Sequence, residues 1–137
     1  MHDEQRLGLV KAARSAALNA YAPYSRFRVG AALLTVDGKV YTGCNVENAS
    51  YPATVCAERV AICKAVSEGE TRFEAIAIAC DSRRPCSPCG ICRQVMAEFA
   101  PDMRVIMVGE DSVIEQRVTD LLPYGFGPGY LTDNEDE

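Results

Sequence analysis

The chain has 137 residues, of which 48% are apolar. That size is typical of one domain with a core that needs no disulfide staples, so we expect a single domain over residues 1–137 with its core at about 4–128. The net charge of −5 disfavours a polynucleotide substrate, because proteins that bind one usually carry a basic surface that neutralises phosphates. The sequence holds no run of about 18 apolar residues, and its polar start is unlike a signal peptide, so we expect a cytoplasmic protein.

The first part of the chain predicts a helix and then a hairpin. Apolar residues recur at three- and four-residue spacing over residues 4–20, which is typical of an amphipathic helix, with Asp3 as its N-cap. Strand-like runs follow at 29–36 and 40–45, and the Asp37-Gly38 pair between them is typical of a hairpin turn.

The remaining segments predict alternating strands and helices. In chain order we expect a loop at 46–54, a helix at 56–66, a buried strand at 73–80, a loop at 81–88, a helix from 88 or 89 to just before 101, a buried strand at 104–108, a strand at 113–118, a helical turn at 120–122, no regular structure at 124–129, and a disordered acidic tail over the last five residues. This order predicts an α/β fold, in which one mixed sheet is covered by helices.

Seven cysteines are an unusually high number for a chain of this length. In a reducing compartment, such a number indicates metal binding or catalysis rather than disulfides. Cys44, Cys63 and Cys80 lie in apolar stretches, so we interpret these three as small core residues.

Three other cysteines form a candidate metal site. Cys89 and Cys92 have the Cys-x-x-Cys spacing that lets two thiolates bind one ion, and Cys56 offers a third thiolate, with Glu58 two residues later. Both groups lie at predicted helix starts, where free N–H groups stabilise thiolates. Residues two apart on a regular helix point about 200° apart, so Cys56 and Glu58 can share a site only if Cys56 precedes the helical turn.

The number of ligands favours catalytic over structural zinc. Structural sites usually have four protein ligands, whereas catalytic sites have three and an open position. His2 in a frayed terminus is a poor fourth ligand, and Cys86 is too close to Cys89 to fold back onto the same ion. Zinc with three thiolates carries a negative charge, which Arg59 or Arg93 could offset by donating hydrogen bonds to the sulfurs. Alternatively, both arginines are solvated helix residues.

The motif resembles the signature of the cytidine deaminase family in its three-cysteine form. It stands here as Cys56-Ala57-Glu58-Arg59 and Pro88-Cys89-Gly90-Ile91-Cys92-Arg93-Gln94, and the resemblance extends over about residues 21–126, including 24–32, 42–51 and 121–123. It implies a three-layer α/β/α fold with a five-stranded mixed sheet. It also implies a zinc ion in each chain and a homotetramer that deaminates free cytidine and 2′-deoxycytidine in pyrimidine salvage.

The resemblance also implies residue roles. Glu58 would carry protons from a zinc-activated water to N3 of the base and to the departing amine. Asn45 and Glu47 would bind the ribose hydroxyls, and Phe27 would pack on the pyrimidine. Further substrate-binding positions would be Val46, Ala57, Ala49, Tyr51 and Phe126, of which the last three match positions that reach into neighbouring subunits.

Simpler interpretations of these residues stay open. Phe27 could be a core residue, Asn45 and Glu47 could be turn formers, and Phe126 could anchor the tail. Three rival functions also stay open: deamination of another aminopyrimidine nucleoside such as a blasticidin-type antibiotic, a non-enzymatic zinc module that binds a protein, and a polynucleotide deaminase. The string Asn45-Val46-Glu47-Asn48 favours an ordinary ribose, a zinc module would have four ligands and no use for Glu58, and the acidic charge disfavours a polynucleotide.

Overall fold

The computed structural model describes residues 1–132, and the predicted disordered tail, 133–137, lies outside the described residues. The helices of the described part are α1 (Asp3–Ala17), α2 (Ala57–Ser67), α3 (Gly90–Phe99) and α4 (Val118–Leu121), with short 3₁₀ helices η1 (Tyr51–Ala53) and η2 (Pro128–Tyr130). The strands are β1 (Val29–Thr35), β2 (Val40–Cys44), β3 (Phe73–Cys80), β4 (Arg104–Val108) and β5 (Val113–Arg117).

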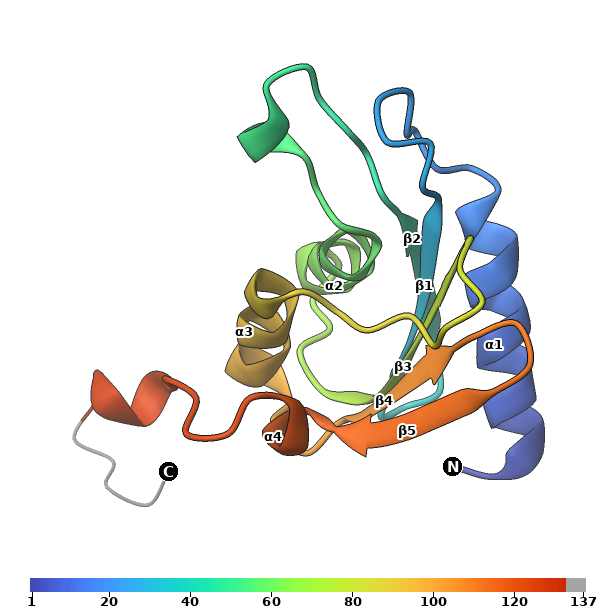
Figure 1. Ribbon diagram of the computed structural model, residues 1–137. Helices are drawn as coiled ribbons and strands as arrows, with labels where there is room; N and C mark the ends of the chain where they lie inside the picture. Colours follow the sequence, from blue (N-terminus) through green and yellow to red (C-terminus); the bar gives the residue numbers. More distant parts are fainter. Residues whose placement is uncertain (133–137) are drawn as a thin grey trace.

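The five strands form one mixed sheet in the order β2-β1-β3-β4-β5 (Figure 1). Strands β3 and β4 are parallel, and every other neighbouring pair is antiparallel. The β1–β2 hairpin turns at Gly38, whose φ of 92° lies in the left-handed region that glycine adopts without strain. The predicted five-stranded mixed sheet is therefore confirmed.

Helices cover both faces of the sheet, which gives three layers (Figure 1). On one face, Leu9 and Ala13 of α1 pack into a cluster with alternate residues of the strands. On the other face, α2 and α3 pack on the opposite set through residues such as Ile62 and Met96. This alternation is what the period-two pattern of a sheet buried on both faces requires.

The close approach of α2 to the sheet depends on a glycine in β2. A Cβ atom at Gly43 would lie 2.5 Å from the carbonyl oxygen of Ala57 and 2.6 Å from the backbone nitrogen of Ala61. Because Ala57 is the first residue of α2, the bare backbone of Gly43 fixes where this helix begins. The sheet therefore positions Cys56, the residue just before the helix.

Two expectations about α1 are wrong. His2, not Asp3, is the N-cap: its ring nitrogen Nδ1 accepts a hydrogen bond from the backbone N–H of Gln5 at 3.3 Å. The helix also ends at Ala17, because the backbone N–H groups of residues 18–20 bond three residues back instead of four. Within residues 1–132, no helix is long and apolar enough to cross a bilayer.

Short helical turns replace two predicted irregular segments. The loop at 46–54 contains η1, and the glycine-rich stretch contains η2; both have a proline in the first turn, where the missing N–H costs nothing. The helical turn expected at 120–122 begins earlier, at Val118, and β5 ends correspondingly at Arg117.

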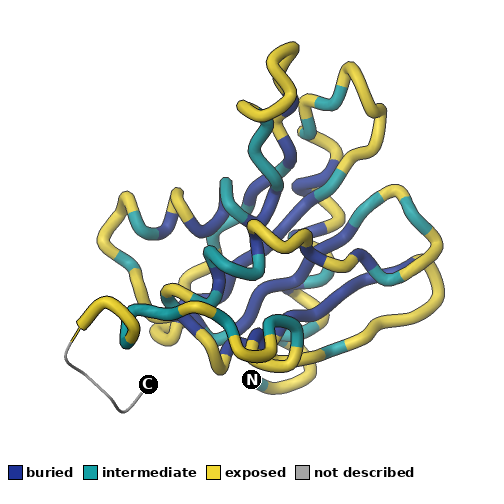
Figure 2. The backbone as a smooth tube through the Cα atoms, turned by 60° about the vertical axis from the view of Figure 1, so that its left-hand side comes forward, coloured by how far each residue is buried: buried dark blue, intermediate teal, exposed yellow. Residues whose placement is uncertain are grey.

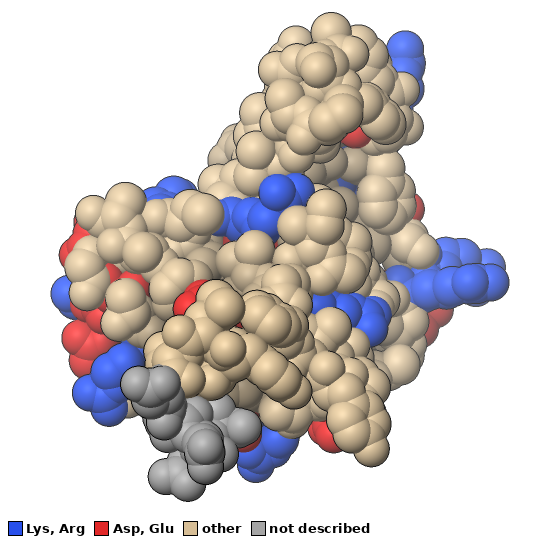
Figure 3. Space-filling model, turned by 90° about the vertical axis from the view of Figure 1, so that its left-hand side faces the viewer, with Lys and Arg blue, Asp and Glu red and all other residues tan. Residues whose placement is uncertain are grey.

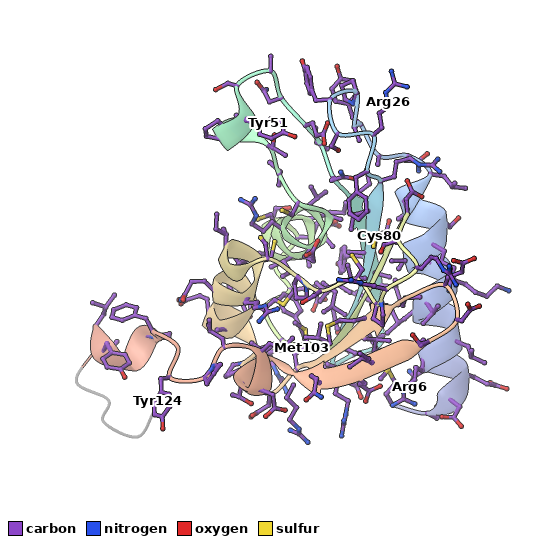
Figure 4. All side chains as sticks on the ribbon, viewed as in Figure 1. Arg6, Arg26, Tyr51, Cys80, Met103 and Tyr124 are labelled. Carbon is purple, nitrogen blue, oxygen red and sulfur yellow. The ribbon has the colours of Figure 1, made fainter. Side chains whose placement is uncertain are left out.

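Two exposed loops project from the sheet beyond β1 and β2. We call residues 46–55 the arm and residues 21–28 the Phe27 loop; Figure 2 shows most of both as exposed, whereas strands β1, β3 and β4 are mostly buried. Backbone bridges between Val46 and Val55, and between Tyr21 and Val46, tie the bases of the two loops together. In Figure 4, Arg26 of the Phe27 loop and Tyr51 of the arm mark these projections.

Candidate functional site

The structure brings the three predicted cysteine ligands together. The Sγ atom of Cys89 lies 3.9 Å from that of Cys56 and 3.5 Å from that of Cys92, and all three sulfurs lie within 4.8 Å of one another. They come from the N-terminal ends of α2 and α3, which lie on the same face of the sheet (Figure 1). Two segments more than thirty residues apart in sequence therefore form one sulfur cluster.

Local backbone geometry explains this convergence. Cys56 and Cys89 are the N-caps of α2 and α3, with φ and ψ of −71° and 154°, and −70° and 169°, which are extended conformations. Neither side chain makes a capping hydrogen bond, so both sulfurs are available to a ligand. Cys56 thus lies at the non-helical edge of the turn, as sharing one site with Glu58 requires.

The spacing of the sulfurs fits zinc. Two sulfurs bound tetrahedrally to one zinc ion at about 2.3 Å would lie about 3.8 Å apart. The two measured separations of 3.5 and 3.9 Å bracket that value. Cys56, Cys89 and Cys92 would hold the ion, and a fourth position would stay open for a water molecule or a substrate.

The cluster favours a thiolate at Cys56. Hydrogen bonding from the Cys92 thiol, together with Arg59 and Cys89, lowers the pKa of Cys56 to about 5. The proton that Cys92 shares with Cys56, and the burial of Cys92, raise the pKa of Cys92. Packing three sulfurs together thus makes full ionisation costly in the absence of a cation, and a divalent ion would remove that cost.

Glu58 is a buried carboxyl group beside the sulfurs. It follows the first residue of α2 and is only 4% exposed. Burial raises the pKa of Glu58 to about 7, and the negative charge of Cys56 acts in the same direction. A carboxyl group with such a pKa can both accept and return a proton near neutral pH, which is the property of a general acid and base.

Arg59 contacts the cluster directly. Its Nη2 atom lies 3.6 Å from the Sγ of Cys56 and 3.4 Å from the carbonyl oxygen of Thr54. Its pKa is raised, first by the hydrogen bond with Cys56 and also by the interaction with Cys92. Its buried Nε atom has no hydrogen-bond partner among the described residues. The guanidinium of Arg59 therefore places its positive charge next to the sulfurs.

Arg93 has different partners from those expected. Its guanidinium donates to the carbonyl oxygens of Pro88 and Leu121, both at 2.8 Å, and to the hydroxyl of Ser87 at 2.7 Å. Within residues 1–132, no hydrogen bond joins it to a sulfur. The expected contact with the sulfurs is corrected: Arg93 braces the segment before Cys89 against the end of α4.

The other cysteines stand apart from the sulfur cluster. Cys86 is buried in the core beside α2 and α3 and is not among the three clustered sulfurs, and its burial raises the pKa of its thiol. The interpretation of the remaining three as small core residues is wrong for Cys63, which is exposed; Cys44 is only half-buried, and Cys80 is half-buried and packs against the core. Their stretches are apolar, but these positions lie at strand ends or on the outer face of α2.

Asn45 is a buried residue that holds the backbone of the Phe27 loop. Its Oδ1 atom accepts a hydrogen bond from the Val29 N–H at 2.9 Å, and its Nδ2 atom donates to the Phe27 carbonyl oxygen at 2.8 Å. Asn45 therefore supports the backbone of the loop, which is the simpler role left open for it in the sequence analysis. Its amide still has a second donor and further acceptor capacity for a ligand.

Glu47 holds the other end of the same loop. It is 6% exposed, and its Oε1 atom accepts from the backbone N–H groups of Tyr24 at 3.0 Å and Ser25 at 3.1 Å. The Ser25 hydroxyl donates a short hydrogen bond to its Oε2 atom. These donors, the Ser25 hydroxyl first, lower the pKa of Glu47, so the group is a carboxylate at neutral pH.

Phe27 lies in the loop that these two polar residues hold. Its side chain is 42% exposed, which excludes the simple core interpretation. Val46 is also exposed, whereas Ala57 is fully buried. Sequence reasoning missed Ser25, although it lies in the matched segment 24–32, because only the fold brings it to Glu47.

Three predicted substrate-binding residues lie away from the sulfurs of their own chain. Ala49 and Tyr51 lie on the exposed arm, and Tyr51 is at its tip (Figure 4). Phe126 is 53% exposed in the C-terminal segment, where its ring stacks on Tyr130 with centroids 5.0 Å apart. Its carbonyl oxygen accepts a hydrogen bond from Gln94 of α3 at 2.7 Å.

The chain resembles known deaminases over most of its length. Residues 3–109 match the family model of the cytidine and deoxycytidylate deaminase zinc-binding region. A cytidine deaminase of Halalkalibacterium halodurans is 52% identical over 127 residues, covering 91% of this chain and 96% of the relative. One from Sporosarcina psychrophila is 49% identical over 120 residues, covering 86% and 88%. The crystal structure of cytidine deaminase from Burkholderia pseudomallei matches with a TM-score of 0.86 and 46% identity, covering 92% of this chain and 100% of that one.

Proposed function

The chain belongs to the cytidine and deoxycytidylate deaminase family of hydrolases, and we propose that it converts free cytidine and 2′-deoxycytidine to uridine and 2′-deoxyuridine with release of ammonia. The observation that carries this proposal is the buried Glu58 beside three sulfurs whose spacing fits one zinc ion in each chain. The close relatives are named for cytidine, and the nucleoside is small and uncharged, as the acidic chain favours.

The protein's own residues would divide the reaction between them. When bound, zinc supplies activation of a water molecule as the nucleophile that attacks C4 of the base. Glu58 would take one proton from the attacking water and deliver it to N3, and would then take the second proton from the hydroxyl group added at C4 and pass it to the departing amine. Its burial supports this role because a pKa of about 7 leaves both of its protonation states accessible. Arg59 offsets the negative charge of the sulfurs.

The Phe27 loop and its two polar supports would bind the nucleoside. Asn45 and Glu47 would accept hydrogen bonds from the ribose hydroxyls, and Phe27 would stack on the pyrimidine. Glu47 is ionised and buried, so a ribose hydroxyl donating to its remaining lone pairs would make a charge-assisted hydrogen bond. Val46 and the backbone of Ala57 would complete the contacts within one chain.

A homotetramer would complete each site. Exposed aromatic side chains lie on the arm and on the C-terminal segment, namely Tyr51, Tyr124, Phe126 and Tyr130. In Figure 3, the face that carries these segments has broad areas without charged side chains. Exposed apolar side chains such as these aromatic rings, gathered on one face, are typical of subunit interfaces. Ala49, Tyr51 and Phe126 would then reach the sulfur clusters of neighbouring subunits.

We place the reaction in the cytoplasm, in pyrimidine salvage. All seven cysteines are free thiols, three of them at the proposed metal site, and free thiols persist in a reducing compartment. The rival zinc module is disfavoured because a fourth protein ligand is not found among residues 1–132. An aminopyrimidine antibiotic and a polynucleotide are alternative substrates that an assay can exclude.

The test is the loss of cytidine ultraviolet absorbance with equal release of ammonia, measured with and without a chelator. We expect turnover of cytidine and of 2′-deoxycytidine that the chelator abolishes and added zinc restores. Single-stranded DNA and blasticidin S serve as competing substrates, and we expect neither to slow the reaction. Zinc-independent turnover, or preferential deamination of either competitor, would contradict the proposal.

A further inference from the structure

The hydroxyl of Ser25 lies between the two groups proposed to bind the nucleoside. It donates a hydrogen bond to Oε2 of Glu47 and accepts one from the backbone N–H of Phe27 at 3.0 Å. We propose that Ser25 is a positioning residue that couples the ribose-binding carboxylate of Glu47 to the orientation of Phe27. The inference rests on the proposed function, because it assigns both neighbours to nucleoside binding.

The chemistry of the hydroxyl allows Ser25 to make both contacts at once. A serine hydroxyl has one proton and two acceptor lone pairs. Its proton is committed to Glu47, and a lone pair is committed to the Phe27 N–H. The other oxygen of Glu47 already accepts two backbone N–H groups, from Tyr24 and Ser25. Removing the hydroxyl would therefore leave the Phe27 N–H without its partner and one side of the carboxylate without its donor.

The Phe27 loop depends on such polar contacts because apolar packing does not hold it. Residues 23–28 are all exposed, and none belongs to a helix or strand. Arg26 has a φ of 60°, in the left-handed region that costs a non-glycine residue about 1 kcal/mol or more. Hydrogen bonds must hold the backbone in this conformation: the Arg26 N–H donates to the Ala22 carbonyl oxygen at 2.9 Å, and the next N–H, that of Phe27, donates to the Ser25 hydroxyl at 3.0 Å.

The supports on either side of Phe27 act on different atoms. Asn45 holds the Phe27 carbonyl oxygen and the Val29 N–H, whereas Ser25 holds the Phe27 N–H. The peptide groups before and after the ring are thus both fixed, which sets the direction of the Cα–Cβ bond. Without the Ser25 hydroxyl, the peptide group before Phe27 would lose its side-chain partner, and only the peptide group after Phe27 would keep one. The ring, 42% exposed, would then sample several directions.

The expected kinetic effect separates positioning from catalysis. Ser25 lies outside the α2 and α3 helix starts that carry the sulfurs and Glu58. Its loss should therefore weaken nucleoside binding and leave the chemical step largely intact. A single hydrogen-bonded link of this type corresponds to an increase in KM of about tenfold, with kcat within about threefold of wild type.

The test compares Ser25→Ala with Ser25→Thr, which retains the hydroxyl, and with Ser67→Ala. Ser67 is exposed at the end of α2, and its hydroxyl bonds to the Lys64 carbonyl oxygen far from the site. We expect the tenfold rise in KM only in Ser25→Ala, rescue by Ser25→Thr, and wild-type kinetics in Ser67→Ala. Zinc content should be the same in all. Hydrogen–deuterium exchange should be faster over residues 24–28 in Ser25→Ala only.

Three results would overturn the inference while the proposed function stands. One is a wild-type KM in Ser25→Ala. Another is a KM in Ser25→Thr that is raised as much as in Ser25→Ala, which would indicate that the site requires a particular side-chain shape and not the hydroxyl. A fall in kcat with loss of zinc would make Ser25 a structural residue and would also overturn it. A wild-type protein that does not deaminate cytidine would instead overturn the proposed function, and the inference with it.

Discussion

The guanidinium of Arg59 lies against the thiol of Cys56, with Nη2 3.6 Å from Sγ, and both residues belong to the start of α2. The same nitrogen lies 3.4 Å from the carbonyl oxygen of Thr54, at the end of the arm. A positive charge is thus fixed beside three sulfurs that carry negative charge when they bind a metal ion. This charge would preserve the ability of the bound ion to polarise water.

Replacing Arg59 with Gln should lower turnover without unfolding the protein. Glutamine keeps hydrogen-bonding capacity but lacks the charge, so we expect kcat to fall by about tenfold or more, the scale of losses on removing a group that supports metal ligands. Cytidine turnover and zinc content at equilibrium measure the effect. Arg93→Gln is the comparison: because no hydrogen bond joins Arg93 to a sulfur within residues 1–132, its loss should lower thermal stability and have a smaller effect on kcat. Unchanged kinetics in Arg59→Gln would make Arg59 a solvated helix residue.

Glu58→Gln should fold and bind zinc yet lose at least about 100-fold in kcat, the usual scale for a positioned proton carrier. The amide is nearly isosteric and cannot accept and return a proton. Because the native carboxyl group is 4% exposed, the neutral amide should also be tolerated in the core. Elemental analysis and turnover are measured on the same preparation. Retention of most of the activity by a zinc-loaded Glu58→Gln would show that another group carries the proton.

The sulfur cluster was predictable because its signals are local. Cys-x-x-Cys spacing and the start of each helix can be identified within a few residues, and a sheet buried on both faces brings such helix starts to one edge. Strand limits also agreed to within a residue or two, since β1 and β3 are long apolar runs between turn residues. The N-cap of α1 was mispredicted because a histidine ring seldom takes this position.

Side-chain contacts between segments far apart in the sequence were beyond prediction. Arg93 donates to Leu121, 28 residues later, and Ser25 donates to Glu47, 22 residues later. The first pairing depends on how α3 packs against the end of α4, the second on how two loops cross, and no periodicity encodes either. Arg93 is next to the ligand Cys92 in the sequence, as the interpretation of the motif assumed. Its side chain nevertheless points toward the end of α4, where it donates to the Leu121 carbonyl oxygen. Residue type and spacing thus indicate which groups gather, whereas loop packing decides what they touch.

Replacing Gly43 with Ala should destabilise the fold and disturb the metal site together. The added Cβ would lie within 2.6 Å of two backbone atoms of α2, so the helix start that carries Cys56 must shift. We expect a loss of about 1–3 kcal/mol in unfolding free energy, typical of an overpacked core, with weaker zinc binding. Gly8→Ala is the control, since a Cβ there meets nothing within 4 Å and should raise stability slightly. Full zinc affinity in Gly43→Ala would contradict the coupling.

The contribution of Glu47 to stability should depend on pH. The Ser25 hydroxyl and two backbone N–H groups lower its pKa in the folded protein, so its ionised form stabilises the fold above the unfolded pKa of about 4.3. As pH falls through the lower folded pKa, this stabilisation is lost. The unfolding free energy of wild type minus that of Glu47→Gln should therefore be constant from about pH 5.5 to 7 and shrink below about pH 4.3.

Denaturant unfolding at a series of pH values measures this difference. Loss of zinc at acid pH affects both proteins and cancels in the subtraction. Ser25→Ala provides the control, because removing the largest cause of the lowered pKa should shrink the pH-dependent part. A difference that grows as the pH falls would mean that the folded pKa of Glu47 is raised instead of lowered.

Mixing two inactive variants should restore activity if neighbouring subunits share sites. Phe126 is 53% exposed in a segment away from the sulfurs of its own chain, held by Gln94 and stacked on Tyr130. Glu58→Ala keeps a sound Phe126, and Phe126→Ala keeps a sound Glu58. If one site takes these residues from different chains, random reassembly of equal amounts should give about a quarter of sites with both sound residues. Cytidine turnover after co-refolding measures this fraction. Light scattering tests the tetramer itself, and mixtures that show only the average of the two variants would place Phe126 in its own chain's site or in none.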